Sequence, residues 1–135
     1  MNVFGVTGWK NAGKTGLMER LVGEISCRGY LVSTLKHAHH SFDVDHIGKD
    51  SHRHRLAGAS QVLLASTERW ALMEENRGAP ELTLDQLLLK LDPVDLVLIE
   101  GWKRDLHPKI EAWRAEAGNP LIAPQDPTIL AVATD

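Results

Sequence analysis

Residues 8–15 of the chain read Gly8-Trp9-Lys10-Asn11-Ala12-Gly13-Lys14-Thr15. This stretch fits the pattern G-x-x-x-x-G-K-[ST] at every fixed position, and average residue frequencies would produce such a match by chance in roughly one chain of this length in a few hundred. A loop with Gly at both ends can curl so that successive backbone N–H groups point inward at a phosphate, and the helix that follows adds its positive N-terminal end. The stretch therefore predicts a phosphate-binding loop between a strand and a helix.

The residues on either side have the periodicities that this loop requires. Residues 3–6 form a short apolar run, and residues 14–28 repeat apolar side chains at helical spacing until Gly29. Further strands are predicted at 31–35, 94–99, 110–113 and 129–134, and an antiparallel hairpin at 61–66 and 70–73. Two more helices are predicted. Asp50 or Ser51 caps a short one, and a Thr83–Gln86 capping box begins the other, whose apolar face extends to Leu91. The alternation predicts a P-loop-type α/β fold, with a mostly parallel sheet, helices on both faces and an antiparallel hairpin.

The composition is that of an ordinary globular chain. Its 135 residues, 43% hydrophobic content and net charge of −3 predict a single nucleotide-binding domain over residues 1–135. A mildly acidic balance argues against nucleic acid as the main partner, because that affinity depends on a basic face. No apolar run approaches the roughly 18 residues of a membrane span, and the first residues do not resemble a signal peptide, so we expect a cytoplasmic protein with no membrane partner.

The loop and a later acid together predict a nucleotide site with a metal ion. Lys14 is the candidate catalytic charge for the β and γ phosphates, Thr15 offers a hydroxyl for Mg²⁺, and the backbone of residues 8–16, Gly16 included, would bind the nucleotide. Glu100 ends the apolar run 94–99, where an acid can reach Mg²⁺, so it is the second candidate catalytic residue and a metal ligand. Gly101 could bring a backbone N–H near a γ-phosphate. Asp95 lies at the start of that run and is expected at the opposite edge of the sheet.

Six of the seven histidines fall between residues 37 and 54. Three interpretations stay open for this segment: a metal site, a site for an anion or a γ-phosphate, and a solvated loop. Its position after the second strand favours the anion site, and a loop that orders with the γ-phosphate would act as a switch. The candidate anion or switch residues are His37, His39, His40, Lys49 and Arg53. Asp43 and Asp45 are candidate Mg²⁺ ligands, directly or through water.

Four segments together resemble the molybdopterin-guanine dinucleotide biosynthesis adapter family, MobB. They are residues 8–15, the His-rich block 36–45, Gly48-Lys49-Asp50-Ser51, and Glu100-Gly101-Trp102-Lys103. The resemblance implies a homodimeric GTP-binding protein that assists the guanylyltransferase attaching GMP to molybdopterin. As an enzyme it would be at most a slow, Mg²⁺-dependent GTPase acting as an accessory protein, with other molybdenum cofactor enzymes as further partners.

The choice of GTP comes from this resemblance, because the chain has no Asn-Lys-x-Asp motif for guanine. Asp135, at the end of the last strand run, is a candidate for reading the base. Two alternatives remain open at this point: a small-molecule kinase on the same fold, which would need an acceptor pocket and a lid with arginines, and a metal-handling protein that uses the histidines.

Overall fold

The computed structural model describes residues 1–38 and 42–135. These residues divide into two compact units, one formed by Met1–Ala38 with Leu84–Asp135 and the other within His39–Thr83. We call them the sheet unit and the hairpin unit and describe each by itself. Whether residues 1–135 behave as one cooperative domain stays a prediction.

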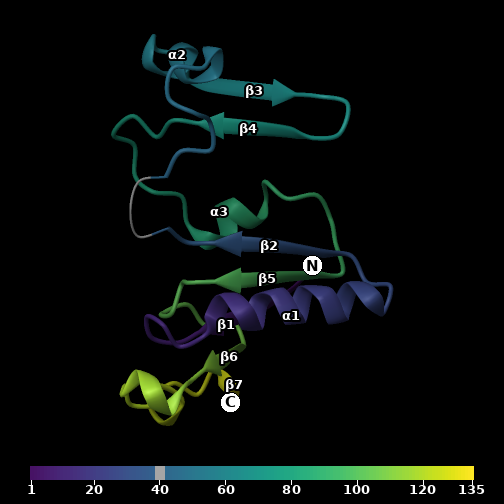
Figure 1. Cartoon of the computed structure of the whole chain (residues 1–135), viewed down its shortest axis with the longest axis vertical. Helices are drawn as coiled ribbons and strands as arrows, with labels where there is room; N and C mark the ends of the chain where they lie inside the picture. The colour runs from purple at the N-terminus through teal and green to yellow at the C-terminus, as the bar shows by residue number, and fades with distance from the viewer. Residues whose placement is uncertain (39–41) are drawn as a thin grey trace. The chain divides into compact units, whose positions relative to one another are not determined.

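The sheet unit is built on five parallel strands in the order β2-β5-β1-β6-β7 (Figure 1). Since all five run the same way, their carboxyl ends meet at one edge, where ligands of open α/β sheets bind. The expected parallel sheet is confirmed, with strand ends that lie within two residues of the predicted ones. The strands are β1 (Asn2–Thr7), β2 (Val32–Lys36), β5 (Leu96–Glu100), β6 (Lys109–Ala112) and β7 (Ile129–Ala133).

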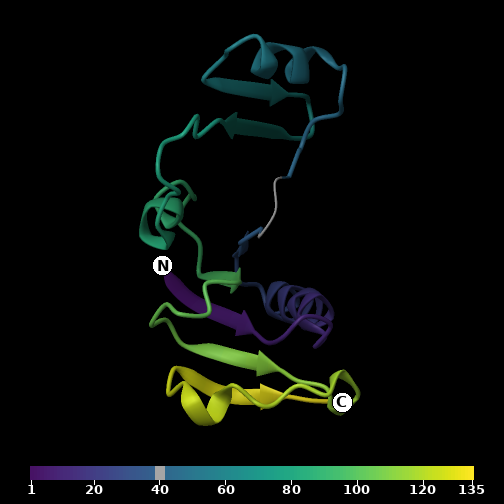
Figure 2. The same cartoon turned by 90° about the vertical axis from the view of Figure 1, so that its left-hand side faces the viewer.

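Helices cover both faces of this sheet (Figure 2). On one face α1 (Lys14–Cys27) packs Met18 against Val6 and Leu98. On the other face α3 (Leu84–Leu88) packs Leu84 against the alternate β5 residues Val97 and Ile99. The apolar run of β5 is therefore buried on both sides, as continuous apolar strands in parallel sheets are.

The second helix of this unit is shorter than its sequence pattern predicts. The apolar spacing extends to Leu91, but α3 ends at Leu88. Leu91 nevertheless packs on the same core cluster from the turn that follows, so burial, and not helical backbone, accounts for its apolar character.

Strand β6 carries two fully buried charged side chains, Lys109 and Glu111. The ammonium group of Lys109 donates to Thr128 Oγ1 at 2.7 Å and to backbone carbonyls. The carboxylate of Glu111 accepts from the backbone N–H groups of Ile122 and Ala123, at the start of the 3₁₀ turn η2 (Ala123–Gln125). These bonds tie the loops before and after β6 to the sheet, because a buried charge must be paired. Another 3₁₀ turn, η1 (Ala115–Ala117), lies between β6 and η2.

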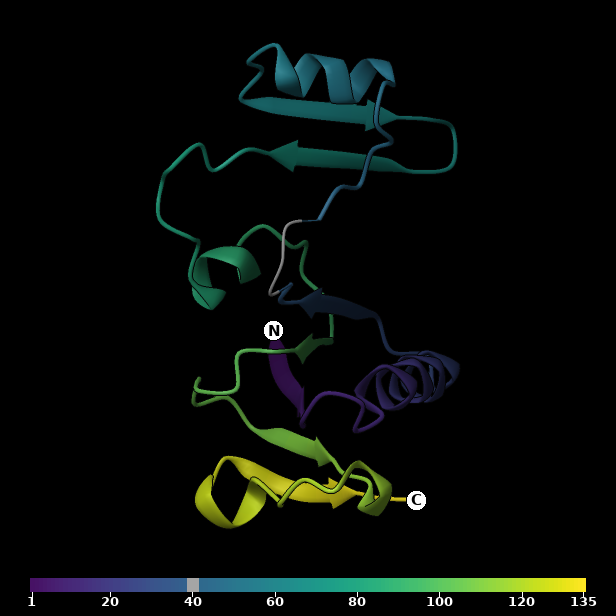
Figure 3. The same cartoon turned by 60° about the vertical axis from the view of Figure 1, so that its left-hand side comes forward.

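The hairpin unit contains α2 (Asp50–Leu56), β3 (Gln61–Ala65) and β4 (Trp70–Glu74). The predicted antiparallel hairpin is confirmed, and α2 lies against β3 (Figure 3). The predicted cap of α2 is wrong: Asp50 is the first helical residue, and Lys49 stands at the N-cap with no side-chain cap hydrogen bond. The acidic side chain of Asp50 lies in the first turn instead, where it complements the helix dipole.

No helix among the described residues is long and apolar enough to cross a bilayer.

Candidate functional site

The loop of residues 8–13 joins β1 to α1 at the carboxyl edge of the sheet. Its curl needs left-handed backbone at Asn11 (φ 64°) and Gly13 (φ 90°). Gly8 is required for space as well, because a Cβ there would lie 2.4 Å from the carbonyl oxygen of Ala112 in β6. No side chain in the described part of the chain caps the first turn of α1, so its first N–H groups have no intrahelical or side-chain acceptor. The loop and helix thus have the backbone arrangement that binds anions.

Lys14 is the first residue of α1 and curls back over this loop. Its Nζ donates a hydrogen bond of 2.7 Å to the carbonyl oxygen of Trp9. Partial burial lowers the pKa of Lys14, and the positive charges of Lys103 and Lys36 lower it further while Glu100 opposes them. The lysine therefore lies in a cation-rich place beside one carboxylate.

Glu100 supplies that carboxylate from the carboxyl end of β5. It pairs in register with Lys36 of β2 on one side and Val6 of β1 on the other, which places it beside the loop. Its side chain is 14% exposed, and its Oε2 lies 3.8 Å from Lys36 Nζ. Asp95, at the opposite edge, accepts a hydrogen bond from the backbone N–H of Leu31. The sequence-based choice between the two acids thus agrees with their positions.

The turn after Glu100 has a strained backbone that is fixed by packing. Gly101 has a φ of 118°, Trp102 follows with a φ of 45°, and a Cβ on Gly101 would lie 2.6 Å from His37 Cβ. The His37 ring stacks at 4.9 Å on the Trp102 ring, and the His37 N–H donates to the Glu100 carbonyl. The turn carries Lys103 back to the phosphate loop, where its Nζ lies 5.2 Å from the centroid of the Trp9 ring.

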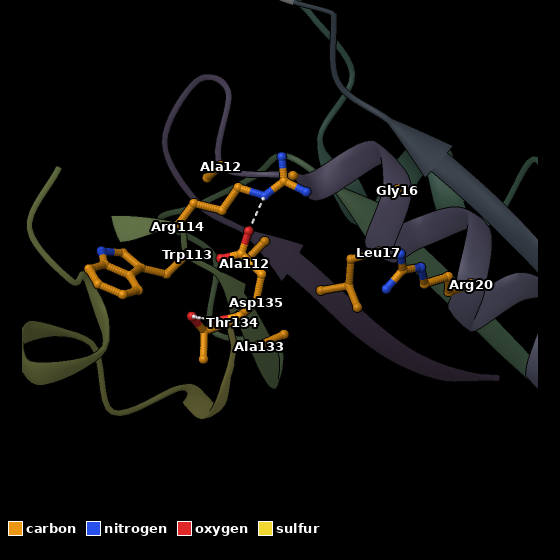
Figure 4. Close-up of a pocket in the computed structure, with 11 residues that line it drawn as sticks. Ala12, Gly16, Leu17, Arg20, Ala112, Trp113, Arg114, Ala133, Thr134 and Asp135 are labelled. Carbon is orange, nitrogen blue, oxygen red and sulfur yellow. Dashed lines mark hydrogen bonds and ion pairs between the residues drawn. The ribbon is translucent and has the colours of Figure 1, made fainter. Parts of the chain in front are cut away.

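A cavity of about 160 Å³ opens beside the loop, between the start of α1 and the carboxyl ends of β6 and β7 (Figure 4). Leu17 and Arg20 of α1 lie on one side of it, and Arg114 and Asp135 lie across from them. Arg114 Nε is 3.3 Å from Asp135 Oδ2. The cavity thus joins the phosphate loop to one carboxylate and two guanidinium groups.

The candidate residues Asp43 and Asp45 belong to the hairpin unit, where both bind Arg55. Arg55 Nη2 lies 2.9 Å from Asp43 and 2.8 Å from Asp45, and Nη1 lies 2.8 Å from Glu75. The hydrogen bond from Arg55 is the main cause that lowers the pKa of Asp45. In this structure an arginine pairs with both carboxylates, and their role as Mg²⁺ ligands stays a prediction.

The His-rich segment is divided between the two units. His37 belongs to the sheet unit, Lys49 and Arg53 belong to the hairpin unit, and His39 and His40 lie outside the described residues. Within residues 1–38 and 42–135, no three His, Cys, Asp or Glu side chains are grouped as a metal site would require.

Sequence reasoning missed two groups of residues at this edge. Lys36 and Lys103 belong to two of the segments that carry the family resemblance, 36–45 and 100–103, but the sequence predicted no site role for either; Lys36 is the last residue of β2, and Lys103 lies in the turn after Glu100. Arg114 follows β6 and lies close to the phosphate loop, since a Cβ on Gly13 would be 3.2 Å from its Nε. The signal that could have found them is their place just after the strands, where parallel sheets gather functional side chains.

Comparison with known proteins gives one consistent family. The profile of the family described as "Molybdopterin guanine dinucleotide synthesis protein B", MobB, matches residues 3–135. A molybdopterin-guanine dinucleotide biosynthesis adapter protein of Haemophilus influenzae is 46% identical over 98% of this chain and 74% of its own length. The adapter protein of Escherichia coli is 42% identical over 94% of this chain and 74% of its own. The crystal structure of a MobB homolog from Bacillus stearothermophilus superposes with a TM-score of 0.71 at 29% identity, covering 99% of this chain and 78% of that one.

Proposed function

This chain belongs to the molybdopterin guanine dinucleotide synthesis protein B family, and from that premise we propose that it is a GTP- and Mg²⁺-binding adapter for the enzyme that attaches GMP to molybdopterin. The observation that carries the proposal is the meeting of Lys14, the uncapped first turn of α1 and Glu100 at one edge of the sheet. The family membership does not favour a small-molecule kinase or a metal-handling protein.

The triphosphate is assigned to the backbone of residues 8–16 and to Lys14. Loop N–H groups and the N-terminal end of a helix of 14 residues favour anions, and the lysine adds a full charge. The Nζ of Lys14 would exchange the Trp9 carbonyl for phosphate oxygens, which form stronger, charge-assisted hydrogen bonds.

The residues present fit a magnesium ion, which supplies charge neutralisation between the phosphates when it is bound. Mg²⁺ usually takes one or two protein oxygens and completes its shell with water and phosphate. Thr15, exposed in the first turn of α1, and Glu100, part-buried at the end of β5, are such oxygens. Lys36 holds the Glu100 carboxylate only loosely, at 3.8 Å, which leaves its oxygens accessible to a metal or to metal-bound water.

The base is assigned to the cavity of Figure 4. Its position next to Gly13 and Gly16 suits a base whose phosphates lie on the loop, and about 160 Å³ can hold a purine. Guanine presents an N–H and an NH₂ group side by side, which match the two oxygens of one carboxylate, whereas adenine does not. Asp135 supplies that carboxylate, and Arg114 holds it in place.

A homodimer is proposed from the hairpin unit. Two strands alone are marginally stable in water. Leu63 pairs in register with Leu72, and Ala65 pairs with Trp70, on one face of the hairpin. Leu63 is 60% exposed and Trp70 is 68% exposed, so this face offers apolar area that a second copy could bury.

The test is a calorimetric titration with GTP, ATP and GDP, each with and without Mg²⁺. We expect the chain to bind GTP more tightly than ATP, and we expect Mg²⁺ to increase the affinity for GTP. The variant Asp135→Asn should lose the preference for GTP over ATP while Arg28→Ala, at the far end of α1, keeps it. Equal affinity of the wild type for GTP and ATP would contradict the base assignment, and failure to bind any nucleotide would contradict the proposed function. The adapter role is tested by adding the chain to a guanylyltransferase reaction, in which it should raise the yield of molybdopterin guanine dinucleotide.

A further inference from the structure

Three lysine side chains and one carboxylate lie beside the phosphate loop. Lys36 Nζ lies 3.8 Å from the Glu100 carboxylate. Lys103 Nζ lies over the Trp9 ring, and Lys14 Nζ is bound to the carbonyl oxygen of the same Trp9. The charges of Lys36, Lys103 and Glu100 all act on Lys14, so each of these three groups lies within electrostatic reach of Lys14.

This group carries more positive charge than its own residues neutralise. It holds one carboxylate and three ammonium groups, and like charges held close together repel one another. Lys14 is accounted for by the phosphates that its motif binds. Lys36 and Lys103 remain, and their excess charge calls for more anionic charge than Lys14 alone neutralises.

We propose that Lys103, together with Lys36, forms a second phosphoryl subsite next to Lys14 and makes the site selective for a nucleoside triphosphate over a diphosphate. The proposal rests on the proposed function, because it places this subsite at the far end of a bound nucleotide. The occupant is a phosphoryl group: the γ-phosphate of a triphosphate, or a separate phosphate ion beside a diphosphate.

The turn that bears Lys103 is built to keep it there. Gly101 and Trp102 have left-handed backbone, and the Trp102 ring stacks on His37, so the turn has few alternative conformations. The N–H of His37 also fixes the turn to the end of β2. Only the ammonium group of Lys103 has to move to reach a phosphate.

The contact with Trp9 holds this ammonium group ready without binding it strongly. A solvent-accessible cation–π contact is weak, whereas a hydrogen bond between an ammonium group and a phosphate oxygen is charge-assisted. Lys103 therefore has a reason to leave the indole when a terminal phosphate is present. Because Trp9 belongs to the loop itself, the lysine starts next to the phosphates it would contact.

The experiment is a calorimetric titration of the full chain with GTP, with GDP, and with inorganic phosphate in the presence of saturating GDP. Lys103→Met removes the charge and keeps the length of the side chain, Lys103→Arg keeps the charge, and Arg104→Gln in the same turn is the matched control. Circular dichroism confirms that each variant folds.

We expect Lys103→Met to weaken GTP by about tenfold, the typical effect of one charged hydrogen bond, and to change GDP affinity by less than about twofold. Lys103→Arg should restore most of the preference, and Arg104→Gln should not alter it. If phosphate binds the wild-type GDP complex and this binding is lost in Lys103→Met, the subsite accepts a separate ion as well.

Equal losses for GTP and GDP, or no loss for either, would overturn the subsite while leaving nucleotide binding established. A wild type that binds no nucleotide would instead refute the proposed function, and the subsite with it.

Discussion

The Nζ of Lys14 donates a 2.7 Å hydrogen bond to the carbonyl oxygen of Trp9, five residues earlier in the chain. The hydrogen bond links the start of α1 to the phosphate loop, and it is made by the lysine that this motif uses to bind phosphate. Its charge is partly desolvated and faces two other lysines, so this ammonium group gains more than an exposed one from meeting an anion.

Replacing this side chain should abolish most of the affinity for nucleotides. In Lys14→Ala the phosphates lose a charge-assisted hydrogen bond, so we expect GTP affinity to fall by roughly 10- to 100-fold. Isothermal titration calorimetry measures the change. Arg28→Ala, which breaks an exposed ion pair with Glu24 in the same helix, is the control. Unchanged affinity in Lys14→Ala would refute the assignment of the loop.

Binding of the phosphates should weaken at alkaline pH. Burial and the neighbouring lysines lower the pKa of Lys14 below its ordinary value of 10.5, so its ammonium group loses a proton at lower pH than a free lysine. Affinity for inorganic triphosphate, a probe without a titrating base, should therefore fall as pH rises through that lowered pKa. Removing the charge of Lys103 raises the pKa of Lys14, so in Lys103→Met the remaining affinity should fall at higher pH. A fall at the same pH in both proteins would contradict the electrostatic coupling.

A side chain at position 101 should destabilise the sheet unit. Gly101→Ala places a Cβ 2.6 Å from His37 Cβ on left-handed backbone, and we expect a loss of about 1–3 kcal/mol in the free energy of unfolding. Urea denaturation followed by circular dichroism measures it. Gly23→Ala, in the interior of α1 with open space around its Cα, should instead stabilise by about 0.5–1 kcal/mol. Equal effects of the two changes would contradict the close approach of His37.

The hairpin unit should lose stability in acid through Asp45. Its hydrogen bond with Arg55 lowers the pKa of Asp45 below 3.8, so the pair stabilises the folded state above that value. The contribution is lost as pH falls through the lower, folded-state pKa. Urea denaturation at successively lower pH should show that the free energy of unfolding declines in the wild type and declines less in Asp45→Asn. Asp92→Asn, which changes an exposed carboxylate in the sheet unit, is the control. The same decline in all three proteins would exclude this ion pair as its cause. A single transition in these curves would also support the expected single domain.

The apolar face of the hairpin should mediate self-association. Leu63→Lys together with Leu72→Lys puts two charges where a second copy would bury leucines, so a dimer should become a monomer in analytical ultracentrifugation. Leu89→Lys, at an exposed leucine just after α3, should leave the dimer intact. A wild type that is monomeric at high concentration would contradict the dimer.

The sequence by itself determined the fold class and the edge of the sheet at which the candidate site residues lie. The loop motif needs a strand before it and a helix after it, the apolar run of β5 needs cover on both faces, and Glu100 follows that run directly. Each of these signals is local, because it depends on residues that are neighbours in the chain. The same local reasoning predicted the hairpin, since its two apolar runs are joined by a tight link.

Only the tertiary structure decided which distant side chains meet. Lys36, Lys103 and Arg114 lie at or just after the ends of three different strands, and they reach the phosphate loop because parallel strands bring their carboxyl ends to one edge. Asp43 and Asp45 look like metal ligands in sequence, but Arg55, ten or more residues away, takes both carboxylates. Periodicity and spacing cannot show such pairs, because the partner of a charged group depends on which chain segments the sheet places side by side.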